Sequence, residues 1–233
     1  MKTKENYFLD PAYLSKKNCV KEGFWTAARI AREPFNGSRA VMQWVAECMR
    51  PTHTHTHTHT HTLLDVGCGP ASKLAEFFPH CRITGIDMPE AVALATNNNP
   101  EGTFYACDLD SDTEIASVSD KLGLFDLILC IDVIEHVLYP EKMLRLIRRH
   151  LKPDTGQAYI STLERDISRG VASEKQPCPH AAHVREWNEA EFTQFVASEG
   201  FIVHECRLTP LSARPTLRTE HMRVQTLRCT VRS

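Results

Sequence analysis

Residues 63–72, Leu-Leu-Asp-Val-Gly-Cys-Gly-Pro-Ala-Ser, constrain the fold of this chain more than any other stretch. A short apolar run ends abruptly at two glycines, and a helical pattern follows with Leu74 and Phe77 on one face. This order predicts a buried parallel strand, a tight turn and a helix. Gly67 and Gly69 allow the backbone to turn sharply and to approach a ligand, because neither has a Cβ. The N–H groups at the start of the helix point to the same place, so the turn is a candidate binding site.

Two classes of ligand use a turn of this kind. The dinucleotide fingerprint reads G-x-G-x-x-G, and Ser72 stands where its last glycine would be. Class I S-adenosylmethionine-dependent methyltransferases read acid-x-G-x-G-x-G, which this stretch resembles at Asp65, Gly67 and Gly69, while Ala71 replaces the third glycine. A carboxylate at Asp65 suits the ammonium group of a methionine moiety and would repel a pyrophosphate. The turn therefore favours the methyltransferase pattern, although a glycine-rich turn that binds nothing would have the same sequence.

Composition indicates a globular protein of ordinary size. The chain has 233 residues, enough for one domain with a sizeable core. With 42% apolar residues, 24% charged residues and a formal net charge of −2, it gives no sign of a nucleic-acid or membrane partner. No apolar run has the length of a membrane span, and the polar first residues contain no apolar signal core. The nine cysteines are scattered without a C-x-x-C pair, so we expect reduced thiols and a cytoplasmic protein.

Residues 1–50 are expected to form an N-terminal helical cap. Two helices are predicted, over 22–32 and 38–49. The segment before the second helix is rich in aromatic side chains, which allows two interpretations: it covers the sheet, or it forms a lid over the substrate. We expect the second helix to cover the core and the aromatic segment to act as the lid, with Tyr13 and Trp25 in contact with substrate.

Residues 51–62 are a low-complexity segment with a strict Thr-His alternation, which slippage on a DNA repeat would produce. In an extended chain its imidazoles would face one side and could hold zinc or nickel adventitiously. The histidines are His53, His55, His57, His59 and His61. An expanded surface loop explains the same sequence, and we expect a loop without a physiological metal role.

The order of elements after the glycine turn predicts an α/β fold. Short apolar runs alternate with helical patterns as far as residue 161. The predicted strands cover 63–66, 82–87, 103–107, 125–131 and 158–161. Such alternation is typical of a parallel sheet that binds its ligand at the carboxyl ends of the strands, within one domain over 63–233.

Two of these strands end in carboxylates that could hold a nucleoside. Asp87 lies 20 residues after Gly67, near the spacing of an acid that binds ribose hydroxyls. A carboxylate only accepts hydrogen bonds, so it can take both hydroxyls of a ribose. Asp108 follows the next strand, where it could accept a hydrogen bond from an adenine amino group. For Asp110 and Asp112, a solvated loop or the start of a helix is the better interpretation.

Further landmarks make the resemblance more specific. Over residues 63–162 the chain resembles class I methyltransferases grouped with the ubiquinone-biosynthesis enzymes. The matching segments are Gly85-Ile86-Asp87, Asp108-Leu109, Phe125-Asp126-Leu127-Ile128, Glu135-His136-Val137 and Leu151-Lys152-Pro153. The resemblance implies a Rossmann-like, mostly parallel sheet of seven strands, with helices on both faces, an antiparallel last strand and added N-terminal helices. It also implies S-adenosylmethionine as the cofactor, held by Asp65, Gly67, Cys68, Gly69, Asp87, Met88, Asp108, Leu109 and Ile131.

Two charged segments after the fifth strand carry the predictions about substrate. Residues 161–166 and 183–187 resemble segments of uncharacterised or saccharide-associated bacterial methyltransferases. Charged residues so dense are costly to bury unpaired, so they form either a solvated loop or a hydrogen-bonded rim around a polar substrate. We favour the rim, with Arg165, Arg185 and Trp187 at the substrate.

Two histidines are candidates for the general base that a hydroxyl nucleophile needs, since histidine titrates near neutral pH. His183 is preferred because Arg185 and Glu186 stand beside it, while His136 could equally be a structural residue. Asp132, Glu135 and His136 also resemble an acid-x-x-Glu-His segment that binds a divalent metal in some ubiquinone-type enzymes. We expect metal-independent chemistry and no bound metal.

The sequence as a whole predicts an enzyme: an S-adenosylmethionine-dependent methyltransferase acting on a small polar metabolite or a saccharide, with O-methylation favoured. The alternative is a catalytically silent, methyltransferase-like protein that binds the cofactor for regulation. A nicotinamide-dependent oxidoreductase is disfavoured by Asp65 and Ser72. A monomer or a homodimer is expected, with a small-molecule substrate and neither nucleic acid nor membrane as partner.

Overall fold

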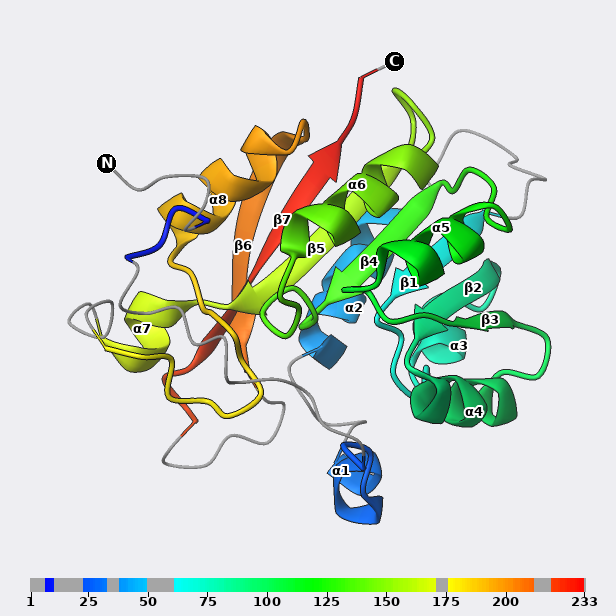
Figure 1. Ribbon diagram of the computed structural model, residues 1–233, viewed down its shortest axis with the longest axis horizontal. Coiled ribbons are helices and arrows are strands. Elements are labelled where there is room, and N and C mark those ends of the chain that lie inside the picture. The colour runs from blue at the N-terminus through cyan, green and yellow to red at the C-terminus, as the bar shows by residue number, and fades with distance from the viewer. Residues whose placement is uncertain are drawn as a thin grey trace.

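A computed structural model describes residues 7–10, 23–32, 38–49, 61–170, 176–211 and 219–232. Within these ranges the chain forms one seven-stranded sheet in the order β3-β2-β1-β4-β5-β7-β6 (Figure 1). The strands are β1 (Thr62–Val66), β2 (Arg82–Asp87), β3 (Thr103–Ala106), β4 (Leu127–Ile131), β5 (Gln157–Leu163), β6 (Ile202–Pro210) and β7 (Arg223–Thr230). The predicted positions of the strands are therefore confirmed to within a few residues.

The sheet is parallel except at one strand. β1 pairs in parallel with β2 and β4, β2 with β3, and β4 with β5. β7 runs antiparallel to β5 on one side and to β6 on the other. The expected mostly parallel sheet with an antiparallel last strand is confirmed, and the carboxyl ends of β1 to β5 lie along one edge.

Helices cover both faces of the sheet (Figure 1). They are α1 (Ala27–Arg32), α2 (Ser38–Met49), α3 (Leu74–Phe77), α4 (Pro89–Asn98), α5 (Asp112–Ser119), α6 (Pro140–His150), α7 (Arg165–Arg169) and α8 (Glu189–Ser198). Residues of α5, α6 and α8 belong to one buried apolar cluster, and residues of α2, α3 and α4 to the other. None of the helices in the described ranges has the length and hydropathy that a membrane span requires.

Successive residues of each strand supply the two apolar clusters. Leu64 on β1 belongs to the cluster under α6, and its neighbour Leu63 belongs to the cluster under α2. The same alternation places Ile128 and Leu129 of β4 on opposite faces, and every residue of β4 is buried. A strand buried on both faces reads as a continuous apolar run, which is why these strands are recognisable in the sequence.

Local signals explain where several helices begin. Proline stands at the first position of α4 and of α6, where its missing N–H costs nothing. Asn188 and Glu191 form a capping box at α8, a spacing of cap and acid that marks the start of a helix in sequence. The Ser111 side chain caps α5, so Asp112 belongs to a helix start rather than to a solvated loop. The short helix α7 was not predicted.

The N-terminal region confirms one expectation and leaves others untested. Helix α2 buries Val41, Trp44 and Val45 against the sheet, and the Trp44 ring meets the Tyr159 ring edge-on at 5.4 Å between centroids. The second helix is therefore core cover, as expected. Tyr13 and the Thr-His alternation over 52–60 lie outside the described residues. The division of the chain at residues 50 and 62 remains a prediction.

Candidate functional site

The glycine turn lies at the carboxyl end of β1, and its geometry explains its glycines. Gly67 has a φ of +76°, and a Cβ there would lie 2.3 Å from the Val133 side chain. Gly69 has a φ of +53°, and a Cβ there would lie 2.8 Å from the Trp25 ring. Ala71 replaces the third glycine of the pattern and still adopts a φ of +52°. This conformation costs an L-residue about 1–2 kcal/mol, so Ala71 is tolerated rather than preferred.

Asp65 and Asp87 face the turn from β1 and β2; together with Gly67 and Gly69 they form what we call the glycine edge. Asp87 accepts hydrogen bonds from the backbone N–H groups of Gly69 at 2.7 Å and Met88 at 2.6 Å. Asp65 is 3% exposed, and burial together with the nearby Asp87 charge raises its pKa to about 8. Within the described part of the chain, no hydrogen bond or ion pair reaches the Asp65 carboxylate. The glycine edge thus contains a buried carboxyl group that a cationic ligand would satisfy.

The remaining residues predicted to bind the cofactor lie along the same edge. Met88 is exposed directly after β2, and Ile131 is the buried last residue of β4. Cys107 donates its backbone N–H to the Asp87 carbonyl, which places half-buried Asp108 beside the end of β2. Buried Cys68 and Leu109 pack into the two apolar clusters. All of the predicted cofactor residues therefore gather at the ends of four adjacent strands, and their role in binding remains a proposal.

Two asparagines from α4 support the turn, and sequence reasoning missed both. Asn98 donates from its side-chain amide to the Pro70 carbonyl, and Asn99 donates to the Ala71 carbonyl, each at 2.8 Å. Asn99 is 7% exposed. Their positions at the end of α4 gave only a weak signal for this supporting role. Asparagine is also common at helix ends where it makes no tertiary contact.

Asp110 has a structural role that differs from both predicted alternatives, a solvated loop and the start of a helix. Its carboxylate accepts from the backbone N–H groups of Leu138 at 2.8 Å and Tyr139 at 2.9 Å. Lys142 donates to the Asp110 carbonyl at 3.1 Å. The loop after β3 is thereby tied to the start of α6, which holds the ends of β3 and β4 together.

Aromatic residues near the N-terminus connect the glycine edge to two histidines. The Trp25 ring lies over Gly69, and the Phe24 ring meets the Trp25 ring edge-on at 5.4 Å and the His136 ring at 6.2 Å. The Arg29 guanidinium lies 3.7 Å from the centre of the Phe24 ring. Trp25, predicted to contact substrate, is therefore next to the glycine edge, and whether it touches substrate remains a proposal.

His183 is held by a buried carboxylate in what we call the histidine loop, residues 176–187. Its Nδ1 lies 2.6 Å from Glu186 Oε1, and Glu186 also accepts from Arg169 Nε at 3.1 Å and Nη2 at 3.0 Å. Burial alone would raise the Glu186 pKa, but the hydrogen bonds from His183 and Arg169 outweigh it and hold this pKa well below its usual range. Because a carboxylate only accepts, the neutral form of His183 carries its proton on Nδ1 and has its lone pair on Nε2.

His136 lies beside His183 but in a different electrostatic setting. The two rings meet edge-on at 4.9 Å between centroids, and His136 Nδ1 donates to the Ala182 carbonyl at 2.6 Å. Burial and the His183 charge lower the His136 pKa to about 3. His136 therefore resists taking up a proton at neutral pH, which makes it the weaker candidate for a general base.

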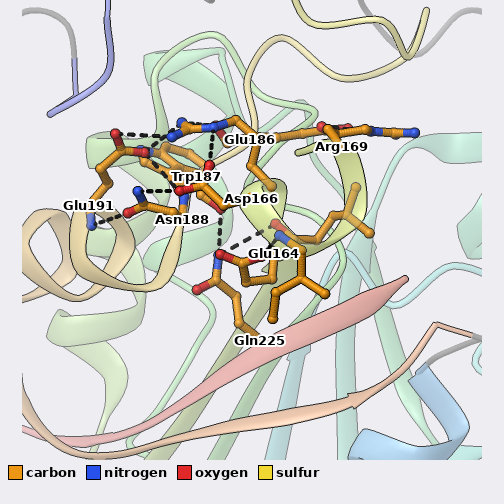
Figure 2. A network of polar contacts seen from close by, with 11 residues as sticks. Glu164, Asp166, Arg169, Glu186, Trp187, Asn188, Glu191 and Gln225 are labelled. Carbon is orange, nitrogen blue, oxygen red and sulfur yellow. Dashed lines mark hydrogen bonds and ion pairs between the residues drawn. The ribbon is translucent and has the colours of Figure 1, made fainter. Parts of the chain in front are cut away.

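A buried polar network braces the histidine loop against α7 and α8 (Figure 2). Fully buried Arg165 donates to Glu191 from Nη1 at 2.6 Å and to Asp166 from Nε at 3.0 Å. Asn188 donates to the other Asp166 oxygen at 2.9 Å, and Gln225 on β7 donates to the Trp187 carbonyl at 2.8 Å. The loop is thus fixed to three elements that lie far apart in the sequence.

Three residues predicted to contact substrate face inward instead. Arg165 and Trp187 are 0% exposed, and Arg185 is 1% exposed. Arg185 donates to the Val137 carbonyl at 2.8 Å and lies 4.4 Å above the Tyr7 ring, while Trp187 stacks on Phe195 at 5.6 Å. The predicted polar rim around substrate therefore differs from what these residues do, because each finds a buried partner brought close by the fold.

Acidic and metal-binding side chains also gather near His183. Asp132 has a φ of +57°, a strained conformation for aspartate, and exchanges two hydrogen bonds with Ser161 at 3.0 and 2.9 Å. Glu135 is 2% exposed, and its Oε2 has no hydrogen-bond partner among the described residues. Ligand atoms of Glu135, His136 and His183 lie within 4.8 Å of one another. The expectation of no bound metal remains a prediction.

Comparison with known proteins gives one broad match over most of the chain. A family model described as a methyltransferase domain matches residues 38–205. The ubiquinone biosynthesis O-methyltransferase of Pseudomonas paraeruginosa is 34% identical over 106 residues, which are 45% of this chain and 45% of that protein. The mitochondrial ubiquinone biosynthesis O-methyltransferase of Saccharomyces cerevisiae is 29% identical over 109 residues, which are 45% of this chain and 34% of that protein. The matched part thus spans less than half of each relative.

Solved structures match over nearly the whole chain. The [4+2]-cyclase SpnF has a TM-score of 0.60 at 16% identity, covering 96% of this chain and 89% of its own. The plantazolicin methyltransferase BpumL, solved in complex with SAH, has a TM-score of 0.56 at 17% identity, covering 84% of this chain and 83% of its own. At identities of 16% and 17% the similarity concerns the fold alone. It confirms the predicted Rossmann-like architecture.

Proposed function

The chain belongs to the methyltransferase-domain family. On that premise we propose that it uses S-adenosylmethionine as its cofactor and methylates a hydroxyl group of a small polar metabolite or saccharide, with His183 as the general base. The single observation that carries the proposal is the buried Glu186 carboxylate, which holds Nδ1 of His183 and is itself held by Arg169. Support for an oxygen acceptor comes from the relatives named O-methyltransferases.

The residues of the glycine edge fit S-adenosylmethionine. The buried Asp65 carboxylate, which has only the Asp87 charge beside it, suits the ammonium group of the methionine moiety. Two backbone N–H groups fix the orientation of the Asp87 carboxylate. Its remaining lone pairs can accept hydrogen bonds from ribose hydroxyls. Asp108, at the end of β3, would accept from the adenine amino group. When bound, this cofactor supplies a methyl group on a positively charged sulfur, which is open to in-line attack.

The Glu186 carboxylate prepares His183 for accepting a proton. By taking the hydrogen bond from Nδ1, it fixes the ring orientation and the tautomer whose lone pair lies on Nε2. A proton that arrives at Nε2 makes an imidazolium, which the buried Glu186 charge stabilises. Arg169 holds that charge in place with two hydrogen bonds. A hydroxyl acceptor must lose its proton as it attacks, and His183 supplies the base for that step.

Replacement of His183 tests this role. His183→Ala should lower turnover by roughly 10²–10⁴-fold, the usual contribution of a general base. The affinity for S-adenosylmethionine should change little, because the glycine edge is untouched. A matched control is His204→Ala on β6, whose ring bonds only Thr230 among the described residues.

The measurement is methyl transfer from labelled S-adenosylmethionine to a fractionated metabolite extract, followed by mass spectrometry of the product. Binding of S-adenosylmethionine is measured on the same samples by calorimetry. Normal turnover in His183→Ala would move the base to His136 or leave positioning as the main source of rate. Binding without transfer to any fraction would favour a catalytically silent cofactor-binding protein.

A further inference from the structure

The histidine loop contains a group of possible metal ligands on the Glu186 side of His183. One ligand atom each of Cys178, His183 and Glu186 lies within 4.8 Å of the other two. Cys178 is 5% exposed and Glu186 is fully buried, so both are shielded from bulk water. All three residues come from one short segment, 178–186, that the buried polar network holds in place. A thiol, an imidazole and a carboxylate are a donor set typical of zinc.

We propose that Cys178, His183 and Glu186 form an inhibitory binding site for a divalent transition-metal ion of the zinc class. Thiolate and imidazole ligands select zinc and related ions, whereas magnesium and calcium prefer sites made of oxygen alone. The ion would lie on the Nδ1 side of His183, since Nδ1 is the ring nitrogen that faces Glu186. The fourth position of a tetrahedral ion would be left to water.

The ligand atoms need only small movements to close around an ion. Usual zinc–ligand bond lengths in tetrahedral geometry put ligand atoms about 3.3–3.7 Å apart. Atoms that now lie within 4.8 Å of one another would therefore approach by roughly 1.5 Å at most. The His183–Glu186 pair, now 2.6 Å apart, would open by less than that. Loop residues 179 and 180 are exposed, which leaves a path for the ion from solvent.

Two negative charges offset the charge of an ion beside Arg169. A deprotonated Cys178 and the Glu186 carboxylate together cancel the charge of a divalent ion, and Arg169, which is 22% exposed, leaves the group with a net charge of +1 that solvent screens. Arg169 can keep its hydrogen bond to Glu186 Oε2 while Oε1 turns to the metal. Binding releases the Cys178 thiol proton to solvent, so it should strengthen as pH rises.

The ion would disable the proposed general base through its tautomer. A neutral histidine that binds a metal through Nδ1 must carry its proton on Nε2. The proton now on Nδ1 moves to Nε2, and that nitrogen can no longer accept the proton of a hydroxyl. This consequence for catalysis rests on the proposed function, whereas metal binding itself does not.

The test uses Co²⁺ as a spectroscopic replacement for zinc in the full chain. The five histidines of the Thr-His repeat are changed to glutamine in every sample, because that repeat could bind cobalt by itself. A thiolate ligand gives Co²⁺ an intense near-ultraviolet charge-transfer band, which histidine and carboxylate ligands do not give. We expect one equivalent of Co²⁺ to produce this band, and Zn²⁺ to abolish it by displacing the cobalt.

Matched cysteine variants assign the band to one residue. Cys178→Ser should abolish the band and weaken zinc binding by roughly 100-fold or more, because a ligand is lost. Cys48→Ser removes an exposed thiol of α2 and should leave both the charge-transfer band and the zinc affinity unchanged. Near-ultraviolet circular dichroism of the metal-free samples shows that each variant is folded.

Long-range ¹H–¹⁵N spectra of the histidines supply an independent measure, because they show which ring nitrogen of His183 carries the proton. Zinc should move that proton from Nδ1 to Nε2. The proposal is overturned if no thiolate band forms at one equivalent, or if the band survives in Cys178→Ser. It is also overturned if zinc binds with Nδ1 still protonated, which would place the ion at Glu135 and His136. None of these outcomes depends on methyl transfer, so they are separable from failure of the proposed function.

Discussion

Asp65 and Glu186 are both buried carboxylates near the carboxyl edge of the sheet, yet their surroundings are opposite. Among the described residues, Asp65 has the Asp87 charge as its one charged neighbour, and burial together with that charge raises its pKa to about 8. Glu186 accepts three hydrogen bonds from His183 and Arg169, and its pKa is lowered. The lack of a partner for Asp65 among the described residues agrees with the proposal that its partner is a ligand. In the histidine loop, Glu186 already has its hydrogen-bond partners within the protein, because its proposed role is to hold His183 in one orientation.

Removing each carboxylate in turn should give stability changes of very different size. Glu186→Gln should destabilise the ligand-free protein by about 2–4 kcal/mol, since Arg169 and His183 lose a buried anion. Asp65→Asn should be neutral or stabilising at pH 7, because no partner is left behind. Urea unfolding of both variants at one pH measures the difference. Equal losses of stability in the two variants would mean that Asp65 has a hydrogen-bond partner in the protein. The proposed difference between Asp65 and Glu186 would then be wrong.

Asp87→Ala should weaken binding of S-adenosylmethionine while the fold stays intact. Loss of charge-assisted hydrogen bonds to ribose hydroxyls should cost about 1.5–3 kcal/mol, or roughly 10- to 150-fold in affinity. Calorimetry measures this, with Asp120→Ala on the far end of α5 as the control. Unchanged affinity in a folded Asp87→Ala protein would remove Asp87 from the site.

The pH dependence of binding should follow Asp65. Its folded pKa is above its unfolded value, so the stability it contributes is complete below about pH 4 and is lost as pH rises through about 8. A cationic ligand requires the ionised form of Asp65, so the affinity for such a ligand rises as pH rises. Affinity for S-adenosylmethionine should fall about 10-fold for each pH unit below 8. Asp65→Asn should bind weakly with a flat profile between pH 6 and 8, and a slope that survives this substitution would assign it to another group.

The Thr-His repeat should matter least to either region. Replacing residues 53–60 with a Gly-Ser linker of half that length should leave the affinity for S-adenosylmethionine unchanged. The free energy of unfolding should change by no more than about 0.6 kcal/mol, the effect of a twofold change in loop length. Thermal unfolding and calorimetry check this. A large stability loss, or methyl transfer that depends on zinc bound to this segment, would contradict the interpretation as a surface loop.

The same contrast explains what the sequence could predict. Asp65 and Asp87 stand at the ends of apolar strands, and strand ends in a parallel sheet converge on one edge. Asn188 was recognisable as a helix cap because its partner Glu191 is three residues away. Local spacing alone was enough in these cases.

The histidine loop could not be read in this way, because its interactions join distant parts of the chain. Arg165, predicted to belong to a hydrogen-bonded rim around substrate, instead pairs with Glu191 inside the protein, and Arg169 pairs with buried Glu186. Trp25 lies over Gly69, a contact that no helical or strand period encodes. Helix α7 is too short for its periodicity to stand out from a loop.

The position of β7 has a consequence for how the chain folds during synthesis. β7 follows β6 in the sequence but lies between β6 and β5 in the sheet. Until β7 leaves the ribosome, β6 has no neighbour to pair with, and the edge of β5 with its buried Tyr159 and Ile160 stays open. Such open strand edges are sites of misassembly. The seven-stranded sheet can therefore close only after β7 has been synthesised and inserted between β5 and β6.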